Sequence, residues 1–88
     1  GNGVIQMFES WAENLYDETF SDVFDALVAE YKNGEITVEQ LKINLAEQQQ
    51  ILLNAFTEGE VKSTYCNAMV DAHQYVLALI NNGKIVRE

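Results

Sequence analysis

Cys66 and His73 are the two side chains of this sequence best suited to nucleophilic or acid–base chemistry. They stand seven residues apart in a stretch that the apolar pattern predicts to be one helix. Their Cα atoms are then about 10.5 Å apart at a rise of 1.5 Å per residue. At that separation a thiol and an imidazole cannot share a proton, and they cannot hold one metal ion unless another helix or subunit adds ligands. We therefore expect Cys66 to be a buried structural cysteine and His73 to be hydrogen-bonded and partly buried.

The carboxylates are a weaker indication of chemistry. Glu9, Glu13 and Asp17 have the i, i+4, i+8 spacing of one helix face, which could hold a divalent cation weakly. Di-iron helical bundles use Glu-x-x-His pairs, but the residue three before His73 is Val70, and the chain has a single histidine. No glycine-rich phosphate loop or dinucleotide motif is present. We expect a solvated acidic face, no metal, no cofactor and no enzyme; a small enzyme or metal protein ranks last among the functions considered.

The helix predicted over about 60–82 is the element on which the rest of the fold should be organised. Its apolar residues cover an arc of roughly 220°, wider than the stripe of about 100° that a surface helix needs. We expect this helix to touch more than one neighbour and to be the innermost. Its polar residues form one narrow strip, consisting of Ser63, Asn67, Asp71, Gln74 and Asn81.

A short corner between two helices is predicted at residues 33–37. Gly34 can adopt the positive φ that a helix C-cap requires. Thr37 and Gln40 have the spacing of a capping box, with Thr37 as the N-cap. Ile36 and Leu41 occupy the two positions of a hydrophobic staple across the same cap.

The N-terminal third carries two apolar faces. Apolar residues within 5–16 share one face, and those within 20–31 share another, rotated by about 100°. We therefore expect a break or kink within residues 17–21, with Thr19 as a new N-cap. An uninterrupted helix over about 4–32 is the alternative.

These patterns predict an all-α fold: a single domain over 1–88, built as an up-and-down bundle of three or four helices with short connections. The C-terminal segment after Gly83 should be either frayed or a short strand-like arm. The predicted elements are helices over about 4–17, 20–32, 38–57 and 60–82, followed by a tail at 84–88.

The charge balance limits the partners. The formal charge is −9, from 14 acids and 5 bases. Residues 1–35 hold eight acids against one base, whereas residues 60–88 are balanced. Nucleic acids and anionic membranes attract Lys and Arg, so we expect neither as a partner; a basic protein is compatible. A lone cysteine and a start without a basic, apolar leader favour a cytoplasmic protein.

Two functions follow from these features. The first is a non-catalytic helical interaction or assembly module that self-associates as a homodimer, because the last helix has more apolar surface than its neighbours can cover. The alternative is an acidic inhibitor or antitoxin-like protein that binds a basic protein through residues 1–35. Docking of an acidic face weakens with salt, and apolar association does not. The predicted interface residues are Trp11, Tyr65, Met69, Tyr75 and Ile80.

Overall fold

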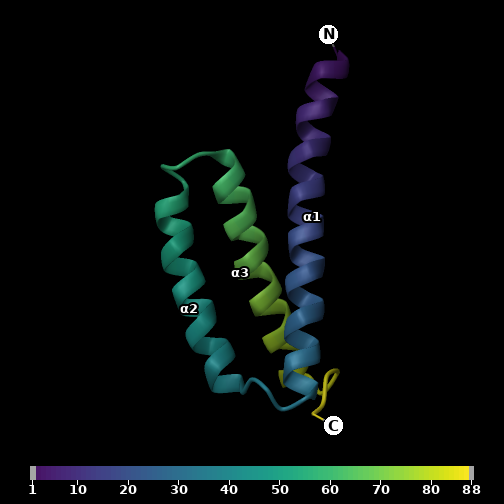
Figure 1. Ribbon diagram of the computed structural model, residues 1–88, viewed down its shortest axis with the longest axis vertical. Coiled ribbons are helices and arrows are strands. Elements are labelled where there is room, and N and C mark those ends of the chain that lie inside the picture. The colour runs from purple at the N-terminus through teal and green to yellow at the C-terminus, as the bar shows by residue number, and fades with distance from the viewer. Residues whose placement is uncertain (1, 88) are drawn as a thin grey trace.

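The computed structural model describes the backbone of residues 2–87 and the side chains of residues 11–87. It contains three helices, α1 (Asn2–Lys32), α2 (Val38–Ala55) and α3 (Glu60–Asn81), and no strand between residues 2 and 87. The chain runs down α1, up α2 and down α3 (Figure 1). The predicted all-α, up-and-down bundle with short connections is confirmed, with three helices rather than four.

The break predicted within residues 17–21 is wrong. α1 continues without interruption from Asn2 to Lys32, close to the alternative of a single helix. Thr19, the expected new N-cap, lies inside the helix and is buried. Sharp kinks need a proline, a glycine or an inserted group, and residues 17–21 contain neither proline nor glycine. Over its described residues the first apolar face is only partly covered, so it does not force a break. Leu15 and Tyr16 are half-buried, and Trp11 beside them stays 43% exposed.

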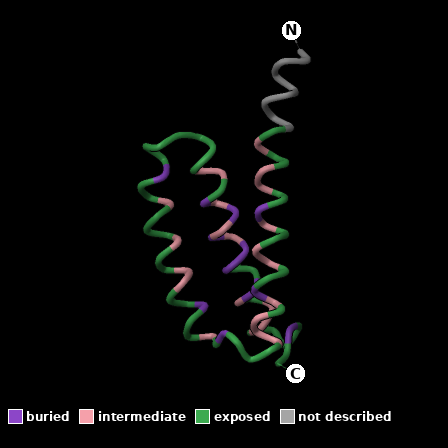
Figure 2. Tube along the Cα trace, in the orientation of Figure 1, coloured by how far each residue is buried: buried purple, intermediate pink, exposed green. Residues whose placement is uncertain are grey.

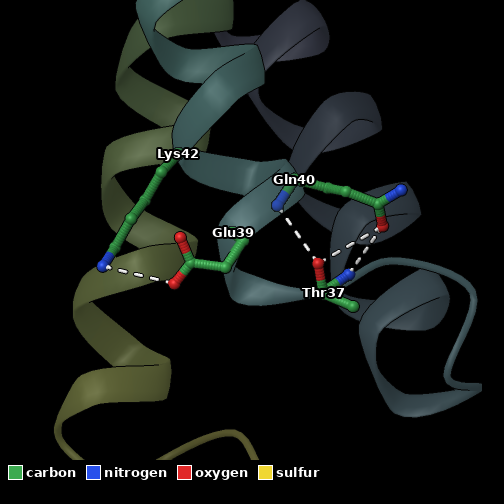
Figure 3. Close-up of polar contacts among 4 residues, drawn as sticks. All are labelled: Thr37, Glu39, Gln40 and Lys42. Atoms are coloured by element: carbon green, nitrogen blue, oxygen red, sulfur yellow. Dashed lines mark hydrogen bonds and ion pairs between the residues drawn. The ribbon is translucent and has the colours of Figure 1, made fainter.

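The corner between α1 and α2 has the predicted caps. The Gln40 backbone N–H donates to Thr37 Oγ1 over 3.1 Å, and the Thr37 backbone N–H donates to Gln40 Oε1 over 3.0 Å (Figure 3). Gly34 takes a φ of +75°. The Glu35 N–H then reaches the Glu30 carbonyl at 2.8 Å, which closes the end of α1 as a Schellman motif.

We expect Thr37→Ala to lower the free energy of unfolding by about 1 kcal/mol, because the first turn of α2 loses its side-chain acceptor. The urea midpoint measured by far-UV circular dichroism reports the change. Thr57→Ala is the control, since the Thr57 hydroxyl is exposed and only donates to the Asn54 carbonyl. Equal midpoints for the two variants would show that the capping box contributes no stability.

The core lies at the end of the bundle where this corner closes. Leu27 of α1, Ile36 of the corner, Leu41 of α2 and Val76 of α3 form one buried cluster, in which Leu41 and Val76 are fully inaccessible. Both staple residues therefore belong to the core. Figure 2 shows the contrast with the opposite end, where the turn between α2 and α3 is largely exposed.

The C-terminal segment is neither frayed nor a strand over its described residues, up to position 87. Ile85 is buried, and the Arg87 guanidinium donates to the Ile36 carbonyl at 3.0 Å. The same guanidinium lies 5.0 Å from the centre of the Tyr31 ring, a cation–π contact. The tail therefore folds back on the corner between α1 and α2.

The bundle is elongated. Its Cα radius of gyration is 15.0 Å, whereas a compact chain of this length would have about 12 Å. The principal extents are 51 × 25 × 19 Å, and the three helices lie side by side (Figure 1). Such an arrangement leaves more surface open to solvent than a closed bundle does.

Candidate functional site

The structure places Cys66 and His73 inside the fold. Cys66 is a free thiol with 3% exposure, as predicted. His73 is 4% exposed, more deeply buried than expected, and its Nδ1 donates to the Met69 carbonyl at 2.7 Å. Among the side chains of residues 11–87, no three His, Cys, Asp or Glu groups converge as metal ligands. Glu9, the first carboxylate of the predicted acidic face, lies outside that range.

We expect Cys66 to react slowly with a thiol reagent in the folded chain and rapidly in urea, because the fold shields the buried thiol from the reagent. The rate of colour release from an aromatic disulfide reagent measures this. A Cys66→Ser chain carrying Ala46→Cys is the control, since Ala46 is exposed on α2. If Cys66 reacts as fast as the control cysteine, the thiol is accessible in the folded chain and could take part in chemistry.

The five predicted interface residues do not share one surface. Trp11, Tyr65 and Tyr75 are 43%, 47% and 51% exposed. Met69 and Ile80 are half-buried. Ile80 packs against the core cluster at one end of the bundle, whereas Tyr65 lies in the first turns of α3 at the other. Their assignment as an interface stays a prediction.

Tyr75 joins α3 to α1 through aromatic packing. Its ring centre lies 5.9 Å from that of Phe20 and 5.5 Å from that of Phe24. Phe20 stacks in turn on Phe24 along α1, with centres 6.0 Å apart. Tyr75 thus contributes to intramolecular packing despite its exposure.

Sequence reasoning missed a group of exposed apolar side chains near the turn between α2 and α3. The turn between α2 and α3 lies at the end of the bundle opposite the corner between α1 and α2 (Figure 1). The adjacent apolar residues Leu52 and Leu53 could have indicated this. They point about 100° apart on the helix, so one packed face of α2 cannot bury both side chains. We call this group of exposed side chains the apolar end; its members are Ile51 (42% exposed), Leu53 (64%), Phe56 (63%), Val61 (57%) and Tyr65 (47%).

A groove runs between α1 and α2 over one side of α3. Its volume is about 450 Å³, and all three helices line it. Met69 and His73 contribute from α3, so one predicted interface residue and the buried histidine meet here. The other lining residues are Asp22, Val23, Ala26 and Leu27 of α1 and Asn44 and Gln48 of α2.

Asp71 has a partner that its place in the polar strip did not predict. The Tyr16 hydroxyl of α1 donates to Asp71 Oδ2 of α3, 55 positions away in the chain. This bond holds the proton on Tyr16, and burial and the nearby carboxylate charge act in the same direction. Together they raise the pKa of Tyr16 to about 12 from the ordinary value of 10.0.

This bond should make the stability of the fold depend on alkaline pH. The folded chain holds the Tyr16 proton more tightly than the unfolded chain, so the contribution is complete below pH 10 and falls as the pH rises towards 12. We expect Tyr16→Phe to cost about 1 kcal/mol at pH 8 and less at pH 11. Urea unfolding of both chains at the two pH values measures the gap. If the difference in stability between the two chains does not narrow at pH 11, the bond to Asp71 does not keep the proton on Tyr16.

Comparison with known proteins leaves these features as the basis for function. No protein-family model, curated protein or solved structure matches the chain. None of the described helices is long and apolar enough to cross a lipid bilayer.

Proposed function

We propose that this chain is a non-catalytic helical interaction module that self-associates as a homodimer through the apolar end. The observation that carries the proposal is the set of five large apolar side chains exposed over the end of α2 and the start of α3. Leu53 of α2 and Phe56, the C-cap of that helix, have i, i+3 spacing, and Val61 and Tyr65 are neighbours on α3 at i, i+4 spacing. Aromatic residues anchor many protein interfaces, and Phe56 and Tyr65 would be the anchors here.

The single chain exposes more surface than a compact monomer of its mass. The chain exposes 5874 Å², whereas a compact monomer of 9.9 kDa exposes about 5,200 Å². The excess, roughly 700 Å², belongs to the chain as a whole, in which α1 extends beyond the turn between α2 and α3 (Figure 1). A dimer through the apolar end would cover surface that the single chain leaves open.

The charge distribution favours self-association at this end over other faces. Eight acids lie in residues 1–35, so two α1 surfaces facing each other would repel. Around the turn, Lys62 pairs with Glu58 at 2.7 Å, which leaves Glu60 as the nearby unbalanced charge. Two copies can therefore meet here with little electrostatic cost, and a two-fold contact is the commonest way for identical chains to do so.

In this proposal α3 is the innermost helix of each protomer. Two observations support that position: α3 contacts both α1 and α2, and no Cα atoms of α1 and α2 approach within 8 Å in the described chain. The first turns of α3 would also enter the interface through Val61 and Tyr65. We propose the cytoplasm as the location, because the one cysteine is a free thiol, as in reducing compartments.

Sedimentation equilibrium at low and high salt tests this function. Apolar self-association should persist, with a dissociation constant that changes less than about threefold between 50 mM and 500 mM NaCl. Dissociation to a 9.9 kDa species as the salt rises would contradict an apolar interface.

A further inference from the structure

The groove between α1 and α2 is lined by a largely buried histidine whose second ring nitrogen has no intramolecular partner and keeps contact with solvent. His73 is 96% buried, and its Nδ1 is committed to the Met69 carbonyl. Because Nδ1 must donate to a carbonyl, the neutral ring leaves Nε2 as an acceptor. Among the side chains of residues 11–87, the hydrogen bonds of His73 involve Nδ1 alone. Every fully buried side-chain nitrogen or oxygen of these residues has a partner, so Nε2 retains some exposure to solvent. The ring lines the groove, so this acceptor is available to a donor that enters from solvent.

We propose that this groove receives a basic amphipathic helix from a partner protein. The apolar face of that helix would lie on Val23, Leu27 and Met69, which line the groove. A Lys or Arg of the helix would pair with Asp22 at the rim, and a side-chain N–H or O–H would donate to His73 Nε2. The inference rests on the alternative function, a basic protein partner, and is independent of self-association through the apolar end.

The arrangement of the helices favours a helix over a small molecule. Pockets for small molecules bury most of their ligand, but here Asp22 and Ala26 are exposed at the rim, so the groove is open along its side. Three helices lie side by side with α3 in contact with both others. A fourth helix laid across α3 between α1 and α2 would add the second layer that helical domains commonly have.

The charges favour a basic partner over a second copy of this chain. Asp22 is the charged residue of the groove lining, and no Lys or Arg lines it. Glu18 and Asp25 lie one turn before and after Asp22 on α1, and all three are exposed. A second copy carries a formal charge of −9 and would be repelled by this rim, whereas a cationic helix would be attracted.

An 18-residue amphipathic peptide of leucine and lysine is the probe, and the same peptide with glutamate in place of lysine is its control. Titration into the full chain, followed by calorimetry and by the NMR signals of the Met69 methyl and the His73 ring, should show binding of the lysine peptide and movement of both signals. Asp22→Lys should weaken the binding about tenfold. Asp17→Lys makes the same charge change on α1 outside the groove and should alter the affinity less than about twofold.

Two bulky substitutions on α1, one inside the groove and one outside it, test whether the peptide binds in the groove or only to the acidic surface of α1. Ala26 lines the groove and Ala29 does not, although both are exposed on α1. Ala26→Phe should weaken the lysine peptide at least tenfold, and Ala29→Phe should leave it unchanged; circular dichroism of both variants confirms that they fold. Equal losses for Asp22→Lys and Asp17→Lys, unmoved Met69 and His73 signals, or equal binding of the glutamate peptide would each overturn the proposal. The test is independent of the dimer, because Leu53 and Phe56 are unchanged in every variant.

Discussion

Leu41→Ala should lower the free energy of unfolding by about 3 kcal/mol, the largest stability change expected from one truncation in this chain. Leu41 has 0% exposure and belongs to the core cluster with Leu27, Ile36 and Val76. It is also the second staple position, so its loss loosens the corner that joins α1 to α2. The cavity should stay open, because the capping box fixes the start of α2.

Leu53→Ala provides the matched control on the same helix. Leu53 is 64% exposed, so the same chemical change should cost less than about 0.5 kcal/mol. Urea unfolding of both variants by far-UV circular dichroism, at submicromolar concentration to avoid dimer formation, gives the two values. Similar costs for Leu41→Ala and Leu53→Ala would mean that the core does not lie where α1, α2 and α3 converge.

The double variant Leu53→Ala/Phe56→Ala should weaken self-association at least about 100-fold. Each side chain is more than 60% exposed in the single chain, so truncation removes contacts to the partner copy and few contacts within the protomer. Truncating a central apolar anchor commonly costs about 1.5–2 kcal/mol of binding, and two such losses give this factor. Sedimentation equilibrium over a range of concentrations measures the dissociation constant.

Ile43→Ala is the control for that double variant. Ile43 is 58% exposed on the same helix but lies near the other end, beside Ile36 and Gln40. Its truncation should leave the dissociation constant unchanged within about twofold. A similar loss of association for Ile43→Ala would place the interface away from the apolar end.

The features predicted correctly from the sequence are those that depend only on residues close together in the chain. The capping box depends on Thr37 and Gln40 alone, and Gly34 closes α1 through bonds to the preceding turn. Ile36 and Leu41 are buried because the same cap turns both towards the helices they join. Such local signals need no knowledge of the rest of the fold.

The incorrect break within residues 17–21 came from an assumption about tertiary structure. A change of apolar face demands a bend only when both faces must be buried. Here Trp11, in the first part of α1, stays 43% exposed. The apolar face of residues 20–31 packs Phe20 and Phe24 against Tyr75 of α3. With no proline or glycine in the segment, the helix continued.

The candidate surfaces are the helix faces that no neighbouring helix covers. The apolar periodicity of the sequence does not show which faces these are. The width of the apolar arc predicted that α3 has surplus apolar surface, but not that Tyr65 lies at one end and Ile80 against the core. The Tyr16–Asp71 bond joins positions 55 apart. The groove is lined by residues of three helices, and how these helices are aligned along one another is known only from the structure. Met69 and His73 could therefore be placed in the groove only there.

The central claim is self-association through the apolar end, and sedimentation equilibrium of the unmodified chain from about 1 to 100 µM tests it most directly. The predicted result is a mass that rises with concentration from 9.9 kDa towards twice that value and levels off there, as a closed two-fold contact requires. A constant mass of 9.9 kDa at every concentration would contradict the claim.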